Sequence, residues 1–331
     1  MLKFKAVAVA AGIAAAGAFT TSTASADELS LAYFMGPKHP MNKGVMTPFG
    51  DKLAELSGGK LTIKQFPGGA LNKVPPKQYS ILLNGVADVI FTLPGYTADV
   101  FPKTNVMGLP GLCDSAFSCT EAMQRVRGEL ETEYNAKVIA IWANAPPVLI
   151  TKDKAVRTLE DLKGMKIRVT SKSDVPIVEA LGASAVAQPV TVINQNLANG
   201  VIDGIMIDPS AIGAFKLFEP ANYVTTWFPG SGSAFVLLMN KDVYNKLSAE
   251  EKGWVDAAAN TDLSLGAGKA YDAASARGLG AAKKNGNEMI VLSDTERAKF
   301  QAKVDAVMAD LASKKVGDST IGQMIAKMSG K

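Results

Sequence analysis

The sequence predicts an α/β protein of two lobes, each built on a sheet covered by helices, and three observations indicate this fold class. Apolar runs typical of strands alternate with helical patterns over Leu29–Phe91 and again over Gly164–Asp208. At Ala145-Pro146-Pro147 two prolines stiffen the backbone and the composition changes. A flexible segment, Gly230–Ser233, then leads into the strand Ala234–Met239. We therefore expect the chain to cross between lobes at both segments.

The individual elements follow from periodicity and from helix caps. Ser248 with Glu251, and Ser293 with Glu296, are capping-box starts of two helices near the carboxyl end. The predicted strands are Leu29–Met35, Lys60–Phe66, Gly85–Phe91, Lys137–Asn144, one from Val148, Gly164–Thr170, Tyr223–Phe228, Ala234–Met239 and Met289–Leu292, and the predicted helices include Pro48–Leu56, Gln78–Asn84, Glu121–Tyr134 and Val175–Leu181.

The strand within Gly164–Thr170 carries an arginine, Arg168, in an apolar run. A guanidinium on a buried strand costs free energy unless an acceptor meets it, and its planar fork suits a carboxylate. Ligands of such sheets bind outside the carboxyl ends of the strands, where Arg168 and Ile207 fall. The sequence therefore predicts a carboxylate-binding site at this edge.

Other candidate ligand contacts are residues that we place at strand ends or in adjoining loops. Tyr96 could stack on an apolar ligand or pack its loop onto the domain, and His39 could bind ligand or local backbone. About half of the apolar candidates are expected to belong to the core. The candidate set is Arg168, Tyr96, Phe34, His39, Trp142, Pro147, Val148, Ile207, Asp208, Trp227 and Phe228.

Met1–Ala26 has the pattern of a secretory signal peptide. Lys3 and Lys5 precede an apolar run that ends in Ala24-Ser25-Ala26, so we expect cleavage after Ala26 and export to the periplasm. A membrane anchor is disfavoured because the run is short and rich in alanine and glycine. No later segment approaches about twenty uninterrupted apolar residues, so we expect no membrane span.

The composition disfavours several other functions. The net charge is +4 and there are no basic blocks, so the sequence does not indicate nucleic-acid binding. There is one histidine and no Cys/His cluster, so we expect no metal site. Pro67–Leu71 lacks the lysine and hydroxyl of a phosphate loop, so no cofactor is expected. We expect that the protein is not an enzyme. Asp203 and Asp208 could form an acid–base pair, but Asp203 stands where a carboxylate usually caps backbone amides. Cys113 and Cys119 suggest either a disulfide or two buried thiols.

Three segments resemble the signature region of substrate-binding proteins of TRAP (tripartite ATP-independent periplasmic) transporters: Gly164–Val169, Leu181–Ala183 and Gly200–Gly204. Phe215–Glu219, Phe228–Gly232 and Phe235–Lys241 are similar to a subgroup of these receptors. The resemblance implies that Arg168 holds the substrate carboxylate. It also implies a permease of one small and one large membrane subunit, with uptake driven by an ion gradient.

The same resemblance implies a two-lobed periplasmic binding protein fold with a long helix spanning both lobes, for which only Leu247–Ala282 is long enough. We expect lobe I to comprise 27–145 plus 234–273, and lobe II 146–233 plus 274–331. Many relatives that bind polar sugar acids carry a second arginine near the position of Pro146-Pro147, which this chain lacks.

An apolar wall with one cation favours a small organic acid with an apolar or aromatic body, such as an aryl or branched 2-oxo or 2-hydroxy monocarboxylate. A sulfonate or a C4-dicarboxylate is the alternative ligand. Outside transport, the alternatives are a structural periplasmic protein and a hydrolase.

Overall fold

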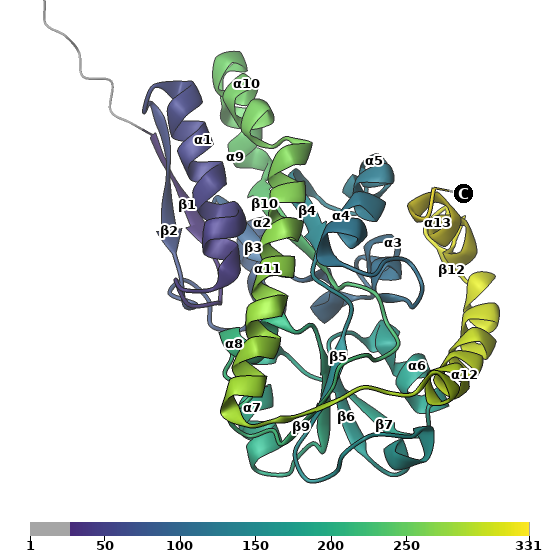
Figure 1. Ribbon diagram of the computed structural model, residues 1–331. Helices are drawn as coiled ribbons and strands as arrows, with labels where there is room; N and C mark the ends of the chain where they lie inside the picture. Colours follow the sequence, from purple (N-terminus) through teal and green to yellow (C-terminus); the bar gives the residue numbers. More distant parts are fainter. Residues whose placement is uncertain (1–26, 331) are drawn as a thin grey trace, which may run out of the picture.

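The computed structural model describes residues 27–330, which form two α/β lobes joined along a long helix, α11 (Thr261–Asn285) (Figure 1). Each lobe has its own β-sheet, and α11 contacts β4 and α4 of one lobe and α8 of the other. The predicted fold class is therefore confirmed. The predicted signal peptide, Met1–Ala26, lies outside the described residues.

The first sheet places the carboxyl ends of four strands, β1, β2, β3 and β4, at one edge. β1 is parallel to β2 and β3, whereas β10 is antiparallel to β3 and β4. Every residue of β10 is buried, which explains its unbroken apolar run. The strand order is β2 (Leu61–Phe66), β1 (Asp27–Ala32), β3 (Val89–Thr92), β10 (Ala234–Asn240) and β4 (Ala136–Ala143).

The second sheet arises from the strand–helix alternation around Arg168. β6 is parallel to β7 and β8, and β5 is antiparallel to β8, so the start of β5 lies beside the end of β8. The strand order is β11 (Glu288–Ile290), β9 (Tyr223–Thr225), β5 (Val148–Thr151), β8 (Gly204–Ile207), β6 (Lys166–Val169) and β7 (Ser184–Ala187).

Helices and short turns surround both sheets. The segments that follow strands of the first sheet are η1 (Asn42–Met46), α1 (Thr47–Ser57), η2 (Pro75–Lys77), α2 (Gln78–Leu83), η3 (Pro94–Thr97), α3 (Pro102–Asn105), η4 (Val106–Gly108), α4 (Ala116–Arg125), α5 (Arg127–Glu131), α9 (Lys241–Lys246) and α10 (Ala249–Ala258). Those of the second are η5 (Leu159–Leu162), η6 (Lys172–Asp174), α6 (Val175–Ala180), α7 (Val190–Ala198) and α8 (Ser210–Ala214).

The long helix differs from the prediction because Leu247–Ala282 is not continuous. α10 starts at the predicted Ser248 capping box and ends at Ala258. The side chain of Asn260 then accepts a hydrogen bond from the Leu263 amide and starts α11 as a new helix. Asparagine favours such caps, so this residue marks the break.

Two glycines let α11 pack its backbone directly on both lobes. A Cβ atom on Gly268 would lie 2.8 Å from Oγ1 of Thr120 on α4, and one on Gly278 would lie 2.0 Å from the carbonyl oxygen of Pro209, just before α8. Larger residues would push the helix away from the segments that border the cleft between the lobes.

The start of α4 also differs from the prediction. The predicted helix Glu121–Tyr134 begins five residues earlier, at Ala116, because Ser115 accepts a hydrogen bond from the Ser118 amide and forms a capping box. The helix then breaks at Val126 before α5. Cys113 and Cys119 form a disulfide that closes this turn, with their Cα atoms 5.0 Å apart, which confirms the first of the two alternatives.

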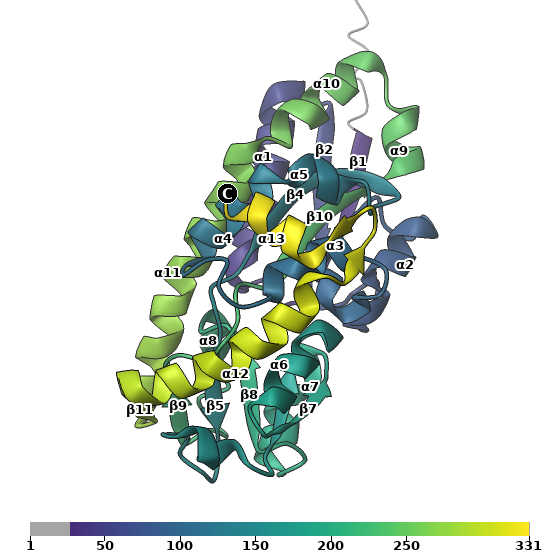
Figure 2. The ribbon, with the colours of Figure 1, turned by 90° about the vertical axis from the view of Figure 1, so that its right-hand side faces the viewer.

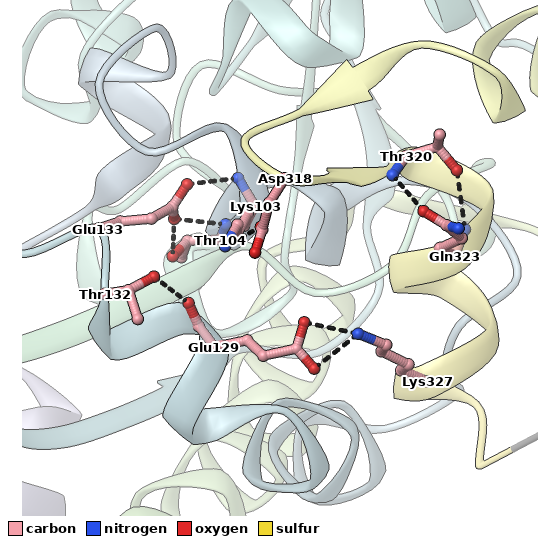
Figure 3. A network of polar contacts seen from close by, with 9 residues as sticks. All are labelled: Lys103, Thr104, Glu129, Thr132, Glu133, Asp318, Thr320, Gln323 and Lys327. Atoms are coloured by element: carbon pink, nitrogen blue, oxygen red, sulfur yellow. Dashed lines mark hydrogen bonds and ion pairs between the residues drawn. The ribbon is translucent and has the colours of Figure 1, made fainter.

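The carboxyl-terminal segment runs from one lobe to the other. α12 (Asp294–Ala312), capped by Ser293 as predicted, packs on α6, and α13 (Ile321–Met328) packs on α4 (Figure 2). The hairpin of β12 (Lys315–Val316) and β13 (Ser319–Thr320) joins them. Figure 3 shows ion pairs that hold this segment to the first lobe, Lys103 with Asp318 and Lys327 with Glu129. The lobe boundaries given above stay a prediction.

Candidate functional site

A cavity lies between the two sheets. It is bordered by residues that follow β1, β3 and β4 in one lobe and β6 and β8 in the other, and its size suits a small molecule. The lining residues are Phe34, Met35, His39, Phe91, Leu93, Tyr96, Asn144, Arg168, Thr170, Val190, Ile207, Asp208, Ser210, Ala211, Phe215, Ser233, Phe235 and Tyr271.

Arg168 is buried at the end of β6, and protein acceptors hold its guanidinium. Nε and Nη2 both donate to the carbonyl oxygen of Gln188, at 2.9 and 2.7 Å, and Nη1 donates to Oγ1 of Thr170 at 3.1 Å. A further contact from Nη1 to the Met206 carbonyl oxygen is long, at 3.5 Å. The edge formed by Nη1 and Nη2 therefore retains N–H donor capacity for a ligand.

Two buried carboxyl groups influence this guanidinium. Burial lowers the pKa of Arg168, and Tyr96, Asp174 and Asp208 oppose that shift. Burial raises the pKa of Asp174 to about 6 and also raises that of Asp208. Oδ1 of Asp208 accepts hydrogen bonds from the amide and hydroxyl of Ser210, and Oδ2 accepts one from Asn144 at 2.8 Å. Asp208 is thus held in place by both lobes.

Tyr96 and His39 reach the cavity from loops of the first lobe. The Tyr96 hydroxyl accepts a hydrogen bond from the Val190 amide at 3.0 Å, which makes a second link between the lobes. Burial raises the pKa of Tyr96, and Arg168 opposes the shift. Nδ1 of His39 accepts a hydrogen bond from the Met41 amide at 3.3 Å, and burial lowers the pKa of His39 to about 4. Both rings are therefore neutral near pH 7.

The structure brings six of the predicted site residues together and places five elsewhere. Arg168, Tyr96, Phe34, His39, Ile207 and Asp208 line the cavity. Pro147 lines a smaller polar cavity behind it, which also touches Asp174 and Ser231. Val148 pairs with Ile207 in the sheet.

The three remaining aromatic candidates pack in hydrophobic cores and do not line the cavity. Trp142 is buried and packs against the rings of Phe91 and Phe235. Trp227 and Phe228 pack edge-on against Phe300 of α12. They follow a strand whose last residue is Thr225, so they continue into the core under α12 instead of reaching the cleft.

Sequence reasoning missed most of the aromatic wall. Phe91 and Phe235 lie within buried strands, and Tyr271 and Phe215 come from or just after helices, where their pattern is that of ordinary core. Asn144 could have been predicted as a site residue, because it is a polar residue directly after a strand that ends in apolar residues.

A basic groove adjoins the cavity and shares His39 and Ser210 with it. Its cationic side chains are Lys38, Lys43 and Arg277, all exposed. Within residues 27–330, no group of three or more His, Cys, Asp or Glu side chains is placed to hold a metal ion. No helix in that range is long and apolar enough to cross a membrane.

Comparison with known proteins gives consistent matches over the described chain. Residues 31–315 match the bacterial extracellular solute-binding proteins, family 7. A marine metagenome TRAP solute-binding protein specific for aromatic acid ligands, in complex with metahydroxyphenylacetate, is 27% identical, covers 92% of this chain and 98% of its own, and has a TM-score of 0.85.

Two further relatives differ in the ligands they bind. A TRAP solute-binding protein from Rhodoferax ferrireducens T118, in complex with copurified benzoate, is 26% identical, covers 92% of this chain and 96% of its own, and has a TM-score of 0.82. The 2,3-diketo-L-gulonate-binding periplasmic protein YiaO of Escherichia coli K12 is 25% identical over 254 residues, which are 75% of this chain and 76% of that protein.

Proposed function

The chain belongs to family 7 of the bacterial extracellular solute-binding proteins, the receptors of TRAP transporters, and we propose that it captures an apolar or aromatic monocarboxylate in the periplasm. The observation that carries this proposal is that Arg168 is the only Lys or Arg side chain lining the cavity among the described residues, and that six Phe and Tyr rings also line it. One cation matches one carboxylate, and the rings match an apolar body.

Other anions fit this cavity less well. A C4-dicarboxylate would bring a second charge that no second cation meets, and a sugar acid would leave hydroxyl groups against Phe34, Phe91 and Phe235. A sulfonate is the second candidate, because its oxygens can also engage the guanidinium. Of the three relatives described above, two bind aromatic acids, which supports the same choice.

A thermal-shift screen of the mature protein tests the ligand class. Aryl monocarboxylates, branched 2-oxo and 2-hydroxy acids, sulfonates, C4-dicarboxylates and sugar acids would be compared at equal concentration. A true ligand at one hundred times its Kd should add roughly 2.7 kcal/mol to the free energy of unfolding. Stabilisation by a C4-dicarboxylate or a sugar acid, with no response to apolar monocarboxylates, would overturn the assignment, and turnover of the ligand would indicate a hydrolase instead.

Delivery requires a membrane partner. Proteins of this family work with TRAP permeases, and we propose that a permease of one small and one large subunit takes the ligand from this receptor and moves it along an ion gradient. Uptake should then continue when ATP is removed while the ion gradient is maintained. Loss of uptake under that condition contradicts the proposed coupling.

A further inference from the structure

A continuous row of aromatic rings lines the cavity. The row starts at Tyr96, whose pKa responds to Arg168, and ends at His39, which also lines the basic groove. Successive ring centroids are 5.2 to 6.4 Å apart. In order, the rings are Tyr96, Phe34, Phe91, Phe235, Tyr271 and His39. The row therefore links Tyr96, which lies beside Arg168, to His39, whose chemistry is different.

His39, which lines both the cavity and the basic groove, presents a neutral N–H donor. Because Nδ1 accepts the hydrogen bond from the Met41 amide, the ring proton of the neutral imidazole is on Nε2. The ring is held between Phe215 and Tyr271, with centroid distances of 5.8 and 6.4 Å. No described residue accepts a hydrogen bond from Nε2, and burial keeps the pKa of His39 low enough for the ring to be uncharged.

Tyr271 supplies a second donor beside His39. Its side chain comes from α11 and is only 2% exposed, and its ring packs on Phe235 at 5.2 Å. Within residues 27–330 its hydroxyl has no hydrogen-bond partner, although it borders the cavity. A hydroxyl without a protein partner at the wall of a cavity is free to donate a hydrogen bond to a ligand atom. Asp208 raises the pKa of this hydroxyl further, after burial, so Tyr271 stays protonated.

We propose that His39 and Tyr271 form a second polar subsite, which binds a neutral oxygen of the ligand, such as a ring hydroxyl. This inference rests on the proposed function, because it takes the carboxylate at Arg168 as given. A methyl group in the same place leaves both donors unpaired. A second carboxylate is disfavoured because neutral donors do not compensate its charge and Asp208 lines the same cavity.

Matched ring substituents test the subsite. The affinities of the mature protein for phenylacetates with a hydroxyl, methyl or carboxyl group at ring position 3 or 4 would be measured by titration calorimetry. We expect one hydroxyl isomer to bind at least about tenfold more tightly than its methyl counterpart.

Three variants assign this preference to the subsite. Tyr271→Phe should reduce the ratio of the two affinities to below about threefold, because it removes one of the two donors. Tyr223→Phe, the same change on β9 away from the cavity, should preserve the ratio. His39→Phe should act like Tyr271→Phe, and if it fails to fold, Tyr271→Phe decides alone.

The outcomes separate this inference from the proposed function. Equal affinity for hydroxyl and methyl compounds, or a preference that survives Tyr271→Phe, overturns the subsite and leaves the monocarboxylate receptor standing. Tighter binding of the carboxyl-substituted compound overturns the neutral character of the subsite. If no aromatic acid binds to the wild-type protein, the proposed function fails and the subsite fails with it.

Discussion

Arg168 keeps its geometry through contacts that only a guanidinium can make. Because Nε and Nη2 share the Gln188 carbonyl oxygen, the fork is oriented before a ligand arrives. We expect Arg168→Gln to weaken carboxylate binding by roughly 10- to 150-fold per lost charge-assisted hydrogen bond, and Arg168→Lys to bind more weakly than wild type despite its charge. Titration calorimetry measures both. Arg157→Lys, an exposed change in the second lobe, is the matched control, and wild-type affinity in Arg168→Gln would refute the anchor.

Asp174 makes folded stability depend on pH. Its carboxyl is buried at η6 beside the Ser171 amide, and its pKa rises from 3.8 to about 6 on folding. The folded state then binds the proton more tightly, so this contribution is complete below pH 3.8 and is lost as the pH rises through about 6. His39 acts oppositely: its pKa falls from 6.5 to about 4, so its contribution is present above pH 6.5 and is lost as the pH falls through about 4.

Because the two effects oppose each other, single variants are needed to see either one. Asparagine does not titrate, so we expect Asp174→Asn to gain stability relative to wild type as the pH rises from about 4 to about 7. The gain should be about 1.4 kcal/mol for each pH unit by which folding raises the pKa of Asp174. Urea unfolding at several pH values measures the difference. A difference that stays constant across this range would show that Asp174 does not titrate as its burial implies.

At the level of elements, α11 depends on the glycine that touches the second lobe. A methyl group on Gly278 would collide with the backbone of Pro209, which lies between Asp208 and the first residue of α8. We expect Gly278→Ala to lower the free energy of unfolding by about 1–3 kcal/mol and to weaken ligand binding. Gly280→Ala, with no atom within 4 Å, should instead raise it by about 0.5–1 kcal/mol. Equal stability of the two variants would contradict direct packing at Gly278.

Strands and caps were predictable from sequence where one physical signal dominates. β4 and β10 are buried on both faces, so their apolar runs are unambiguous, and Ser248 and Ser293 cap helices as their spacing predicts. The break at Asn260 was missed because the alanine-rich sequence on both sides favours helix, so the cap formed by this asparagine was overlooked.

The charged part of the site and some of its apolar wall, such as Phe34 and Tyr96, were predictable, but most of the aromatic wall was not. Arg168 stands out because a buried cation costs free energy unless an acceptor meets it. Phe235 and Tyr271 have the same sequence pattern whether they fill a core or line a cavity. For the same reason Trp142 and Phe228 were placed at the site although they pack in cores. Spatial neighbours, which the sequence does not give, distinguish the two cases.

For the whole molecule, two buried contacts hold the lobes together around the cavity. Asn144 of one lobe donates to Asp208 of the other at 2.8 Å, and the Val190 amide donates to the Tyr96 hydroxyl at 3.0 Å. Both pairs lie beside Arg168, where a ligand carboxylate would add a third link. The chain crosses between the sheets at 144–147 and 226–233, and these short segments can absorb a rotation of one lobe against the other.

We therefore predict that the ligand-free protein samples a more open arrangement and that a bound monocarboxylate shifts it to a compact one. X-ray scattering should show a smaller radius of gyration when a ligand identified by the thermal-shift screen is added to the wild-type protein. Arg168→Gln should show no compaction at the same ligand concentration, because it removes the cation through which the ligand stabilises the closed state. The Lys327–Glu129 pair is exposed and contributes little, so Lys327→Ala should compact like wild type. An unchanged radius in the wild-type protein under saturating ligand would show that the lobes do not move, since closure requires that the ligand bind the closed form more tightly.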